Sequence, residues 1–338
     1  MTGSVKARST RADVARLASV SPAVVSYVIN GGPRPVSAKT KARVERAIAA
    51  LDYRPNETAR ALVRGRSHQV GLVVTDTTNP FYAELAAAID QELFRRNMTL
   101  VTASSVHRPS DAHRTPLESL AEHNVTAVIL ATQVEPSDLA FARIHNLPII
   151  ALNEISPPAD LTATLLDHRG ATITAVQHLV EHGYRRIGFV GNFDPRDPRY
   201  PAWLDALDAA GLPTGPSVDC EWTPEAGYEA GRRLSDPRLT PQAPDALFIA
   251  SDAIALGCIA GLQEAGLRVP DDVAIVSFDG TTLAPFIGPG LTTMTHPIAR
   301  IASDAVSVVL DPDAAPGTHL SYQAQLVIRR SCGCAPAH

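Results

Sequence analysis

The chain has 338 residues, of which 45% are hydrophobic and 19% charged, a composition typical of a globular protein with two or three domains. Its charge is uneven: residues 1–66 hold 13 Lys and Arg against 4 Asp and Glu, a net charge of +9, whereas residues 67–338 hold 17 against 31, a net charge of −14. No apolar run approaches the ~18 residues of a membrane span, and none follows the basic N-terminus as in a secretory signal, so we expect a cytoplasmic protein with no membrane partner.

The basic head is predicted to form three short helices. We expect helices at 10–18, at 22–30 and from 36 to 51. Ser21 and Pro22 are a strong start for the second helix, because Ser caps it and Pro gives up an N–H that has no partner there. The residues expected to face the core of this bundle are Val14, Leu17, Val24, Val25, Val28, Val44, Ala47, Ile48 and Leu51.

The second helix also has a stripe of small and polar residues. Ala23, Ser26, Tyr27 and Asn30 have the spacing i, i+3, i+4, i+7. Two short helices around a three-residue turn, braced by a third, are typical of a helix-turn-helix, whose second helix reads the major groove of DNA. The alternative is a small helical bundle with a solvated basic surface. Charge, cap and turn spacing together favour DNA.

Three segments carry a family resemblance: residues 13–62 (DVARLASVSPAVV… to RAL), VGLVVTDTTNPFYAEL at 70–85 and VPDDVAIVSFDGT at 269–281. Through them the chain resembles the LacI/GalR family of bacterial transcription regulators. The resemblance implies a homodimer that binds a palindromic operator and is switched by a small molecule. It implies a DNA-binding headpiece at 1–55, a hinge helix and linker at 56–67, and an effector-binding and dimerisation domain at 68–338.

The helix positions and the resemblance together give a set of expected DNA contacts. These are Thr10, Arg11, Ser21, Pro22, Ala23, Ser26, Tyr27, Asn30, Arg34, Ser37, Thr40, Tyr53, Asn56, Arg60 and Leu62. Tyr27 departs from the family, which usually has Arg at this place. Tyr cannot read guanine with a bidentate fork, so we expect a different half-site, unless Tyr27 only packs on the sugar-phosphate backbone.

In the family that the chain resembles, the matching hinge segment folds only on DNA and inserts a leucine into the minor groove. Leu62 occupies that place, Asn56 is positioned to cap the short hinge helix, and Arg60 keeps the segment basic. An apolar wedge unstacks a base step and bends the duplex, which allows more contacts. The alternative is that Leu62 is a linker residue packed against the body.

The acidic body alternates apolar strands with amphipathic helices. Strands are expected at 69–74, 99–103, 127–130, 148–152, 186–191, 246–250 and 273–279, and helices at 80–96, 170–182, 201–210, 224–235 and 252–265. Near-continuous apolar strands between helices predict doubly wound parallel sheets, and about ten strands suit two lobes. The class is therefore α/β. No GxGxxG, GxxxxGK[ST] or GxSxG motif occurs, which argues against dinucleotide, P-loop and hydrolase chemistry and against an enzyme.

By the resemblance, the body has a two-lobed, periplasmic-binding-protein-like (type I) fold. The N-lobe is expected at about 68–166 and 297–330, and the C-lobe at about 167–296. The effector is expected between the lobes, at the carboxyl ends of strands. The matched effector positions are Asn79, Phe81, Asn153, Asp167, Arg199, Trp222, Ser251, Asp252 and Asp279.

Carboxylates, amides and an Arg can hold the hydroxyls of a sugar while an aromatic face covers its C–H surface, so a sugar-like effector is favoured. A purine that stacks on Trp222 is the alternative. Simpler roles remain open: Asn79, Asp167 and Asp252 are also placed to cap helices, and Trp222 to fill core. The Pro-rich segment 192–201 departs from the family, so Arg196 could take the place of Arg199.

No cofactor or metal site is expected. The histidines are interpreted as scattered without metal spacing, and Cys332 and Cys334 as a C-x-C pair without further ligands nearby. The leading hypothesis is an effector-controlled repressor of sugar uptake or catabolism genes. A sugar-binding protein retained in the cytoplasm, a purine-responsive regulator and a sugar-metabolising enzyme are the competing hypotheses.

Overall fold

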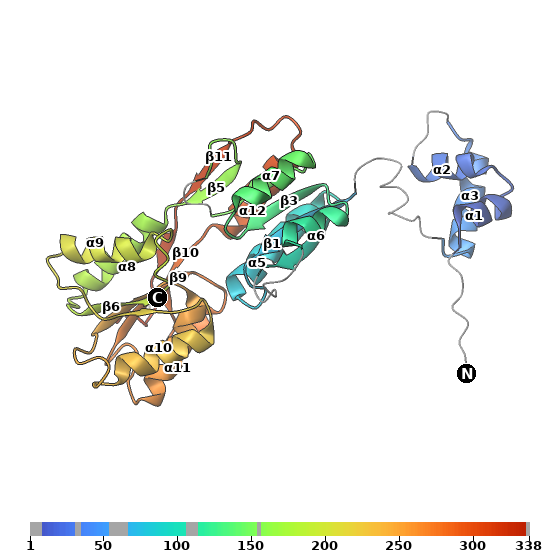
Figure 1. The fold of residues 1–338 in the computed structure, drawn as a ribbon. Coiled ribbons are helices and arrows are strands. Elements are labelled where there is room, and N and C mark those ends of the chain that lie inside the picture. Colours follow the sequence, from blue (N-terminus) through green and yellow to red (C-terminus); the bar gives the residue numbers. More distant parts are fainter. Residues whose placement is uncertain (1–8, 31–34, 54–66, 106–113, 154–156, 336–338) are drawn as a thin grey trace. The chain divides into compact units, whose positions relative to one another are not determined.

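The computed structural model describes residues 9–30, 35–53, 67–105, 114–153 and 157–335. The chain divides into two compact units, residues 1–67 and 68–338 (Figure 1).

In residues 9–30 and 35–53, which the structure describes, the N-terminal unit has three helices around a small apolar core. They are α1 (Arg11–Leu17), α2 (Pro22–Asn30) and α3 (Ala38–Ala50). The buried core is formed by Val14, Ala15, Ala18, Val25, Val44 and Ala47. The predicted helix positions are confirmed, but Leu17 is 55% exposed, and Ala15 and Ala18 fill the core beside Val14 instead.

The C-terminal unit has two lobes, each built on a six-stranded sheet. The first sheet has the order β11-β5-β4-β3-β1-β2. Its strands are β1 (Gln69–Val74), β2 (Thr99–Ser104), β3 (Ala127–Ala131), β4 (Ile149–Ala151), β5 (Ala163–Leu166) and β11 (His319–Tyr322), and all their pairings are parallel.

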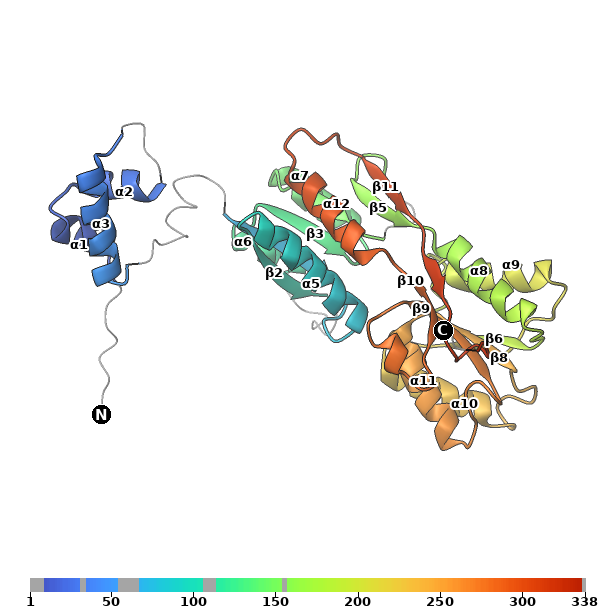
Figure 2. The ribbon, with the colours of Figure 1, turned by 180° about the vertical axis from the view of Figure 1, so that it is seen from behind.

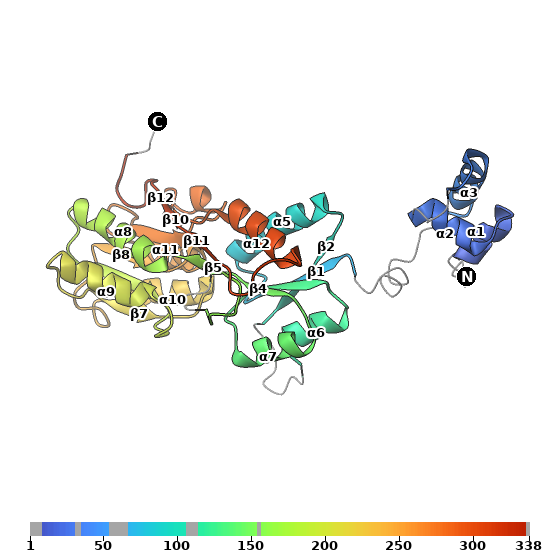
Figure 3. The ribbon, with the colours of Figure 1, turned by 90° about the horizontal axis from the view of Figure 1, so that it is seen from above.

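Among the described residues of this lobe, the helices that cover the sheet are α5 (Pro80–Arg95), α6 (Pro116–Glu122), α7 (Pro136–Ile144) and α12 (Ile298–Leu310). Helices α5 and α12 lie side by side over one face, and α6 and α7 over the other (Figure 3). Residues of β1 alternate between the two faces: Val70, Leu72 and Val74 pack in the core under α5, whereas Val73 packs with Leu117 and Leu120 of α6. Cover on both faces explains why the central strands β1 and β3 are almost entirely apolar and buried.

The C-lobe sheet has the order β12-β10-β9-β8-β6-β7. Its strands are β6 (Ile187–Gly191), β7 (Ser217–Asp219), β8 (Ala246–Ile249), β9 (Ala274–Asp279), β10 (Thr292–Thr295) and β12 (Gln325–Val327). The covering helices are α8 (His168–Glu181), α9 (Arg199–Ala209), α10 (Pro224–Ser235) and α11 (Asp252–Glu264). Helices α8 and α9 lie on one face and α10 and α11 on the other (Figures 1 and 2).

The chain crosses between the lobes after β5, after β10 and after β11. The last crossing corrects the expected N-lobe return at 297–330. Strand β11 completes the N-lobe sheet, but β12 pairs antiparallel with β10 in the C-lobe sheet, from Thr293 with Val327 to Thr295 with Gln325. The N-lobe return therefore ends near Tyr322, because the short link 323–324 leads directly into the edge strand of the other sheet.

Within the described residues, no single helix is long and apolar enough to cross a membrane. The bent pair Arg11–Leu17 and Pro22–Ile29 passes such a test only by length and composition, and its two halves meet at 103°.

Candidate functional site

Helices α1 and α2 of the N-terminal unit have the geometry of a helix-turn-helix. They meet at 103°, within the range of about 90–120° found for this motif. The turn contains Ser19 in the left-handed region, with φ of 51°, and the N–H of Val20 donates to the carbonyl of Ala15. On α2, Val25 is buried in the core, while Pro22 and Ala23 are exposed at its N-terminal end. The exposed start of α2 is the part of a recognition helix that contacts base edges.

Three of the expected DNA-contact residues cap helices. Thr10 forms a capping box with Asp13 at α1, Ser21 accepts from the N–H of Val24 at 3.4 Å, and Ser37 accepts from the N–H of Thr40 at 3.3 Å. The hydroxyl of Ser37 also donates to that of Thr40 at 3.0 Å. These bonds satisfy N–H groups that helix ends leave open, so the three side chains fix the helix starts first.

The other expected DNA contacts are placed as follows. Arg11 is exposed, Ser26 and Tyr27 are half-exposed on α2, and Tyr53 packs partly against the headpiece core. Asn30 ends α2. Arg34, Asn56, Arg60 and Leu62 lie outside the described residues, as does most of the expected hinge.

In the body, side chains from both lobes meet at the carboxyl ends of strands. We call this group the interlobe cluster: Phe81, His168, Arg199, Trp222, Phe278, Asp279 and His296. Phe81 is in the first turn of α5 in the N-lobe, and its ring centroid lies 4.9 Å from that of His296, which follows β10 of the C-lobe. The cluster therefore lies where a doubly wound fold is expected to bind ligands.

Arg199 lies at the centre of the interlobe cluster. It begins α9, its side chain is 14% exposed, and its guanidinium carbon lies 4.8 Å from the ring centroids of both Trp222 and Phe278. Nη1 donates to the carbonyl of Ala250 at 3.2 Å, and the same nitrogen lies 3.5 Å from Asp197. Nε is buried without a hydrogen-bond partner. Arg199 therefore keeps a donor available inside the cluster.

His168 and Asp279 set the charge next to Arg199. The pKa of His168 lies well below its usual value because the ring is buried, and because Arg199 and His296 lie nearby. Asp279 ends β9 with φ of 111°, an unusual conformation for a residue with a side chain, and its Oδ1 lies 3.7 Å from Nε2 of His296. Both ring nitrogens of His296 are buried without a hydrogen-bond partner.

Three expected effector residues act as helix caps. Asn79 accepts from the N–H of Phe81 at 3.0 Å, Asp167 from the N–H of Gly170 at 2.7 Å, and Ser251 from the N–H of Ala253 at 3.1 Å. For Asn79 and Asp167, a helix-capping role was the alternative to effector binding that the sequence left open. Their side chains contribute to helix ends, which lowers the number of free polar groups available to an effector.

Asp252 has a role that the sequence did not indicate. It is 1% exposed and accepts four hydrogen bonds: from the hydroxyls of Ser277 and Thr293, and from both the N–H and the hydroxyl of Thr281. Burial, together with the charge of Asp279, raises its pKa to about 6. Asp252 therefore ties α11 to β9, to β10 and to the loop after β9, and has no acceptor site to spare.

The remaining candidates divide between the cluster and its surroundings. Arg196 pairs with Asp194 and is 63% exposed at its side chain, so it does not replace Arg199. Asn153, after β4, has a left-handed φ of 57° and a buried Oδ1 without a partner. The sequence did not predict His168, Phe278 and His296 as members of the site. Two of them directly neighbour predicted site residues in the sequence, since His168 follows Asp167 and Phe278 precedes Asp279.

The lobes also touch directly near this cluster. Oε1 of Glu84 on α5 accepts from the N–H and the hydroxyl of Thr282, each at 2.7 Å, and Thr282 belongs to the loop after β9. One carboxylate oxygen of the N-lobe therefore holds a loop of the C-lobe.

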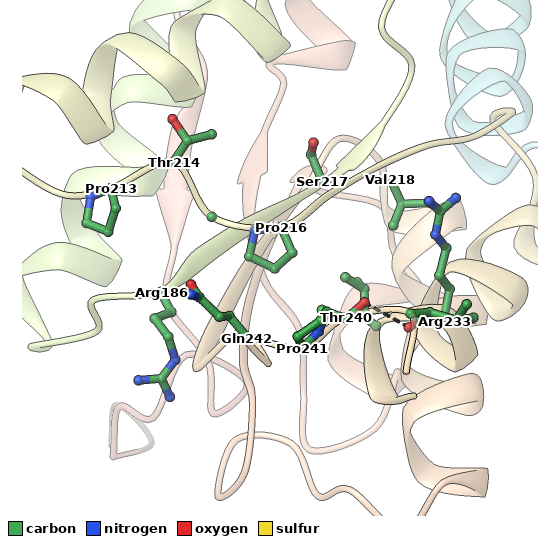
Figure 4. Close-up of a pocket in the computed structure, with 13 residues that line it drawn as sticks. Arg186, Pro213, Thr214, Pro216, Ser217, Val218, Arg233, Thr240, Pro241 and Gln242 are labelled. Atoms are coloured by element: carbon green, nitrogen blue, oxygen red, sulfur yellow. Dashed lines mark hydrogen bonds between the residues drawn. The ribbon is translucent and has the colours of Figure 1, made fainter. Parts of the chain in front are cut away.

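A pocket of about 470 Å³ opens elsewhere on the C-lobe (Figure 4). It lies between the segment 213–218, which leads into β7, and the segment 239–242, with Arg186 and Arg233 at its sides. This is the amino-terminal edge of the sheet, opposite to the end where such folds bind ligands. It contains none of the expected effector residues.

The fold and the two sites define a helix-turn-helix protein with a two-lobed, ligand-binding type of body, and comparisons with known proteins agree. The model of "Bacterial regulatory proteins, lacI family" matches residues 10–56, and that of "Periplasmic binding protein-like domain" matches residues 176–332. The curated "HTH-type transcriptional repressor PurR" of Photorhabdus laumondii is 31% identical over 90% of both chains, and that of Yersinia pestis is 30% identical over 97% of this chain and 98% of the relative.

Solved structures show the same fold. The lac repressor dimer bound to operator superposes with a TM-score of 0.82 at 24% identity, covering 96% of this chain and 99% of that one. A complex of the transcriptional regulator CelR with cellobiose has a TM-score of 0.69 at 28% identity and covers 96% and 100%. The chain belongs to the LacI family of bacterial regulatory proteins. It is a DNA-binding transcriptional repressor and not an enzyme.

Proposed function

We propose that this repressor binds a palindromic operator as a homodimer in the cytoplasm, and that a small sugar-like molecule at the interlobe cluster controls its operator affinity. The target genes would be those for uptake or catabolism of that sugar. Support comes from similar proteins: one solved relative is a dimer on operator DNA, another holds cellobiose, and a third, 24% identical, holds ribose.

The observation that carries this proposal is the set of buried polar atoms without partners at this end of the sheets. Arg199 offers a free donor at Nε, Asn153 an acceptor at Oδ1, and the imidazole of His296 one donor and one acceptor when neutral. Buried polar groups normally have partners, so several buried donors and acceptors without a protein partner favour a polar ligand at this place. A hydroxyl both donates and accepts, and a ring with several hydroxyls suits this mixed set.

The aromatic side chains would provide the second half of recognition. Trp222 is half-buried beside Arg199 and would be the aromatic face that contacts the effector, whereas Phe278 is fully buried and holds the guanidinium of Arg199 in place. An aromatic face covers the C–H surface of a sugar ring while polar groups at the edge hold its hydroxyls. In this proposal Arg199 and Asp279 orient the effector, and Phe81 contributes the N-lobe wall.

Effector binding would act on DNA through the lobes. A ligand that contacts Phe81 of one lobe and Arg199 of the other favours one interlobe arrangement, and the contact of Glu84 with Thr282 belongs to that arrangement. The lobe positions would then set the spacing of the two hinge segments at 56–67 and the insertion of Leu62. The exposed face of α2 with Tyr27 would read the half-site.

A purine is the second candidate. Curated relatives of 30–32% identity are named PurR, and the capping roles of Asn79 and Asp167 leave fewer groups for hydroxyls than the sequence suggested. A planar base could stack on Trp222 and hydrogen-bond to Arg199.

One screen separates the two candidates. Thermal unfolding of the full chain is followed with a panel of mono- and disaccharides and of purine bases and nucleosides, and hits are tested for their effect on operator binding. A ligand present at 100 times its Kd stabilises by about 2.7 kcal/mol. Stabilisation by a sugar supports the proposal, and stabilisation by purines alone replaces the sugar with the second candidate.

DNA binding is tested by the salt dependence of affinity for a palindromic duplex. The full chain should bind with an affinity that falls steeply with salt, because Lys and Arg release counterions from phosphates. The fragment 68–338, which forms a compact unit and carries the whole −14 charge, should not bind. Equal binding by this fragment would contradict the headpiece assignment.

A further inference from the structure

The last turn of α8 and the C-terminal segment bring two histidines and two cysteines together. Their ligand atoms all lie within 4.8 Å of one another: a ring nitrogen from each of His178 and His182, and the sulfurs of Cys332 and Cys334. We propose that these four residues form a binding site for a divalent transition metal ion of the zinc class, which fastens the C-terminal segment to α8.

The distances suit a tetrahedral ion. Sγ of Cys334 lies 3.1 Å from Nε2 of His182 and 3.8 Å from Nε2 of His178. Zinc with Zn–S of about 2.3 Å and Zn–N of about 2.0 Å separates its ligand atoms by about 3.3–3.8 Å. Because no two of the ligand atoms lie more than 4.8 Å apart, small side-chain rotations would bring them to the corners of a tetrahedron.

Each pair of ligands is placed by regular backbone geometry. His178 and His182 are four residues apart, so they share one face at the end of α8, and their ring centroids are 4.7 Å apart. Cys332 and Cys334 flank Gly333, whose φ of 91° turns the chain back and whose N–H donates to the carbonyl of Arg330. A Cβ at Gly333 would lie 2.7 Å from the hydroxyl of Tyr184, so a side chain there would disturb the turn.

The segment that carries the cysteines is held in place without a metal. Ser331 accepts from the N–H of Thr292 and donates to the carbonyl of Ile275, each at 2.7 Å. The hydroxyl of Tyr184 donates to the carbonyl of Cys332 at 3.3 Å, and the Cys332 side chain is fully buried. The site is therefore preorganised, which reduces the cost of gathering four ligands around one ion.

The chemistry of the donors selects the ion. Two imidazoles and two thiolates are the ligand set of closed, four-coordinate zinc sites, and hard ions such as Mg²⁺ and Ca²⁺ prefer oxygen. All four positions are supplied by the protein, so a structural role is favoured over a catalytic one. The ion would join residues more than 150 positions apart, next to the edge strand β12 that makes the third crossing between the lobes.

The test uses the full chain without an affinity tag, reduced with a non-thiol reductant, stripped with a chelator and titrated with Co²⁺. We expect one Co²⁺ per chain, the visible absorption of tetrahedral cobalt, a thiolate-to-cobalt charge-transfer band, and displacement by Zn²⁺. Cys334→Ser and His182→Gln should each weaken binding by more than about tenfold. Cys220→Ser and His123→Gln, which change a thiol and an imidazole outside the group, should keep the wild-type spectrum.

Thermal unfolding gives a second readout that does not need cobalt. Zn²⁺ should raise the unfolding temperature of the wild type and of Cys220→Ser, but not that of Cys334→Ser, while the metal-free proteins unfold at similar temperatures. The proposal is overturned if reduced wild type shows no tetrahedral cobalt spectrum. It is also overturned if both ligand variants keep that spectrum, or if the pair Cys332 and Cys334 forms a disulfide in place of a metal site.

Discussion

Nη2 of Arg199 lies 3.3 Å from Nδ1 of His168. Arginine can only donate, so Nδ1 of His168 must carry a lone pair, and the imidazole is neutral with its proton on Nε2. Burial and the guanidinium charge favour the same state. This contact joins the start of α8 to the start of α9 and places a fixed positive charge at the interlobe cluster.

Replacing Arg199 by Ala should remove the response to the effector while leaving operator binding without effector within about threefold. The loss of a buried charged donor costs about 2–4 kcal/mol of ligand binding, or about 30- to 1,000-fold in Kd. Calorimetric titration with the effector found in the screen measures this. Arg196→Ala is the matched control, because Arg196 is exposed and lies only three residues away. If Arg199→Ala responds to the effector as the wild type does, Arg199 is not part of the effector site.

His168 should make the protein less stable in mild acid. Its pKa in the folded state is lowered by burial, so the unfolded chain takes up this proton first. The stability it contributes is present above the ordinary histidine pKa and is lost as the pH falls below it. Between pH 7.5 and pH 5.5 the unfolding temperature of the wild type should fall more than that of His168→Gln. His123→Gln, at an exposed position, should behave as the wild type.

Asp252→Ala should destabilise the body, because four hydrogen-bond donors lose their acceptor. We expect a loss of about 3–5 kcal/mol at pH 5. The pKa of Asp252 is raised to about 6 in the folded state, so its contribution is greatest below the ordinary pKa of Asp and declines as the pH rises through 6. The effect of the substitution should therefore be smaller at pH 8. Denaturant unfolding at both values measures it, with the exposed Asp271→Ala as control.

Glu84→Ala should weaken effector binding by about two- to tenfold, since one carboxylate oxygen loses two interlobe hydrogen bonds worth roughly 1 kcal/mol together. Glu84→Gln keeps a carbonyl oxygen as acceptor, so its effector affinity should fall between that of the wild type and that of Glu84→Ala. Titration calorimetry of these variants, with Glu181→Ala at the exposed end of α8 as control, separates an interlobe contact from a change of surface charge. Equal effector affinities for the wild type and all three variants would contradict a role of the Glu84 contact in effector binding.

Tyr27→Arg should change the preferred operator half-site. An Arg at this position of α2 can bind guanine with two hydrogen bonds, worth about 1–3 kcal/mol of discrimination at one base pair. Selection from duplexes with a randomised half-site measures the preference of each variant. Tyr27→Phe removes only the hydroxyl and shows whether that group or the ring is used. The same preference in the wild type and in Tyr27→Arg would assign Tyr27 to the sugar-phosphate backbone.

Local patterns in the sequence were sufficient for most of the fold. The helix starts at Thr10, Pro22 and Pro80 follow from capping residues and from proline, whose effects act within three or four residues. The predicted strands β1, β3, β4, β6, β8 and β9 follow from apolar runs that the sheets bury on both faces. Short or half-exposed elements such as β7, β10 and β11 carry little local signal, because their pairing partners lie far away in the chain.

The charge division, the recognition helix and the family were determined by the sequence alone, since each depends on which residues occur and at what spacing. Only the tertiary structure decided which polar residues are free. Asp252 is held by four donors, Asn79 and Asp167 cap helices, and Arg199 remains available. His182 and Cys334 have no common pattern in the sequence. They meet because the chain returns to the C-lobe at β12, which brings the residues after it close to the end of α8. Hydrogen bonds and metal ligation need atoms within a few ångströms of one another, and only the packing of segments distant in sequence brings these atoms so close.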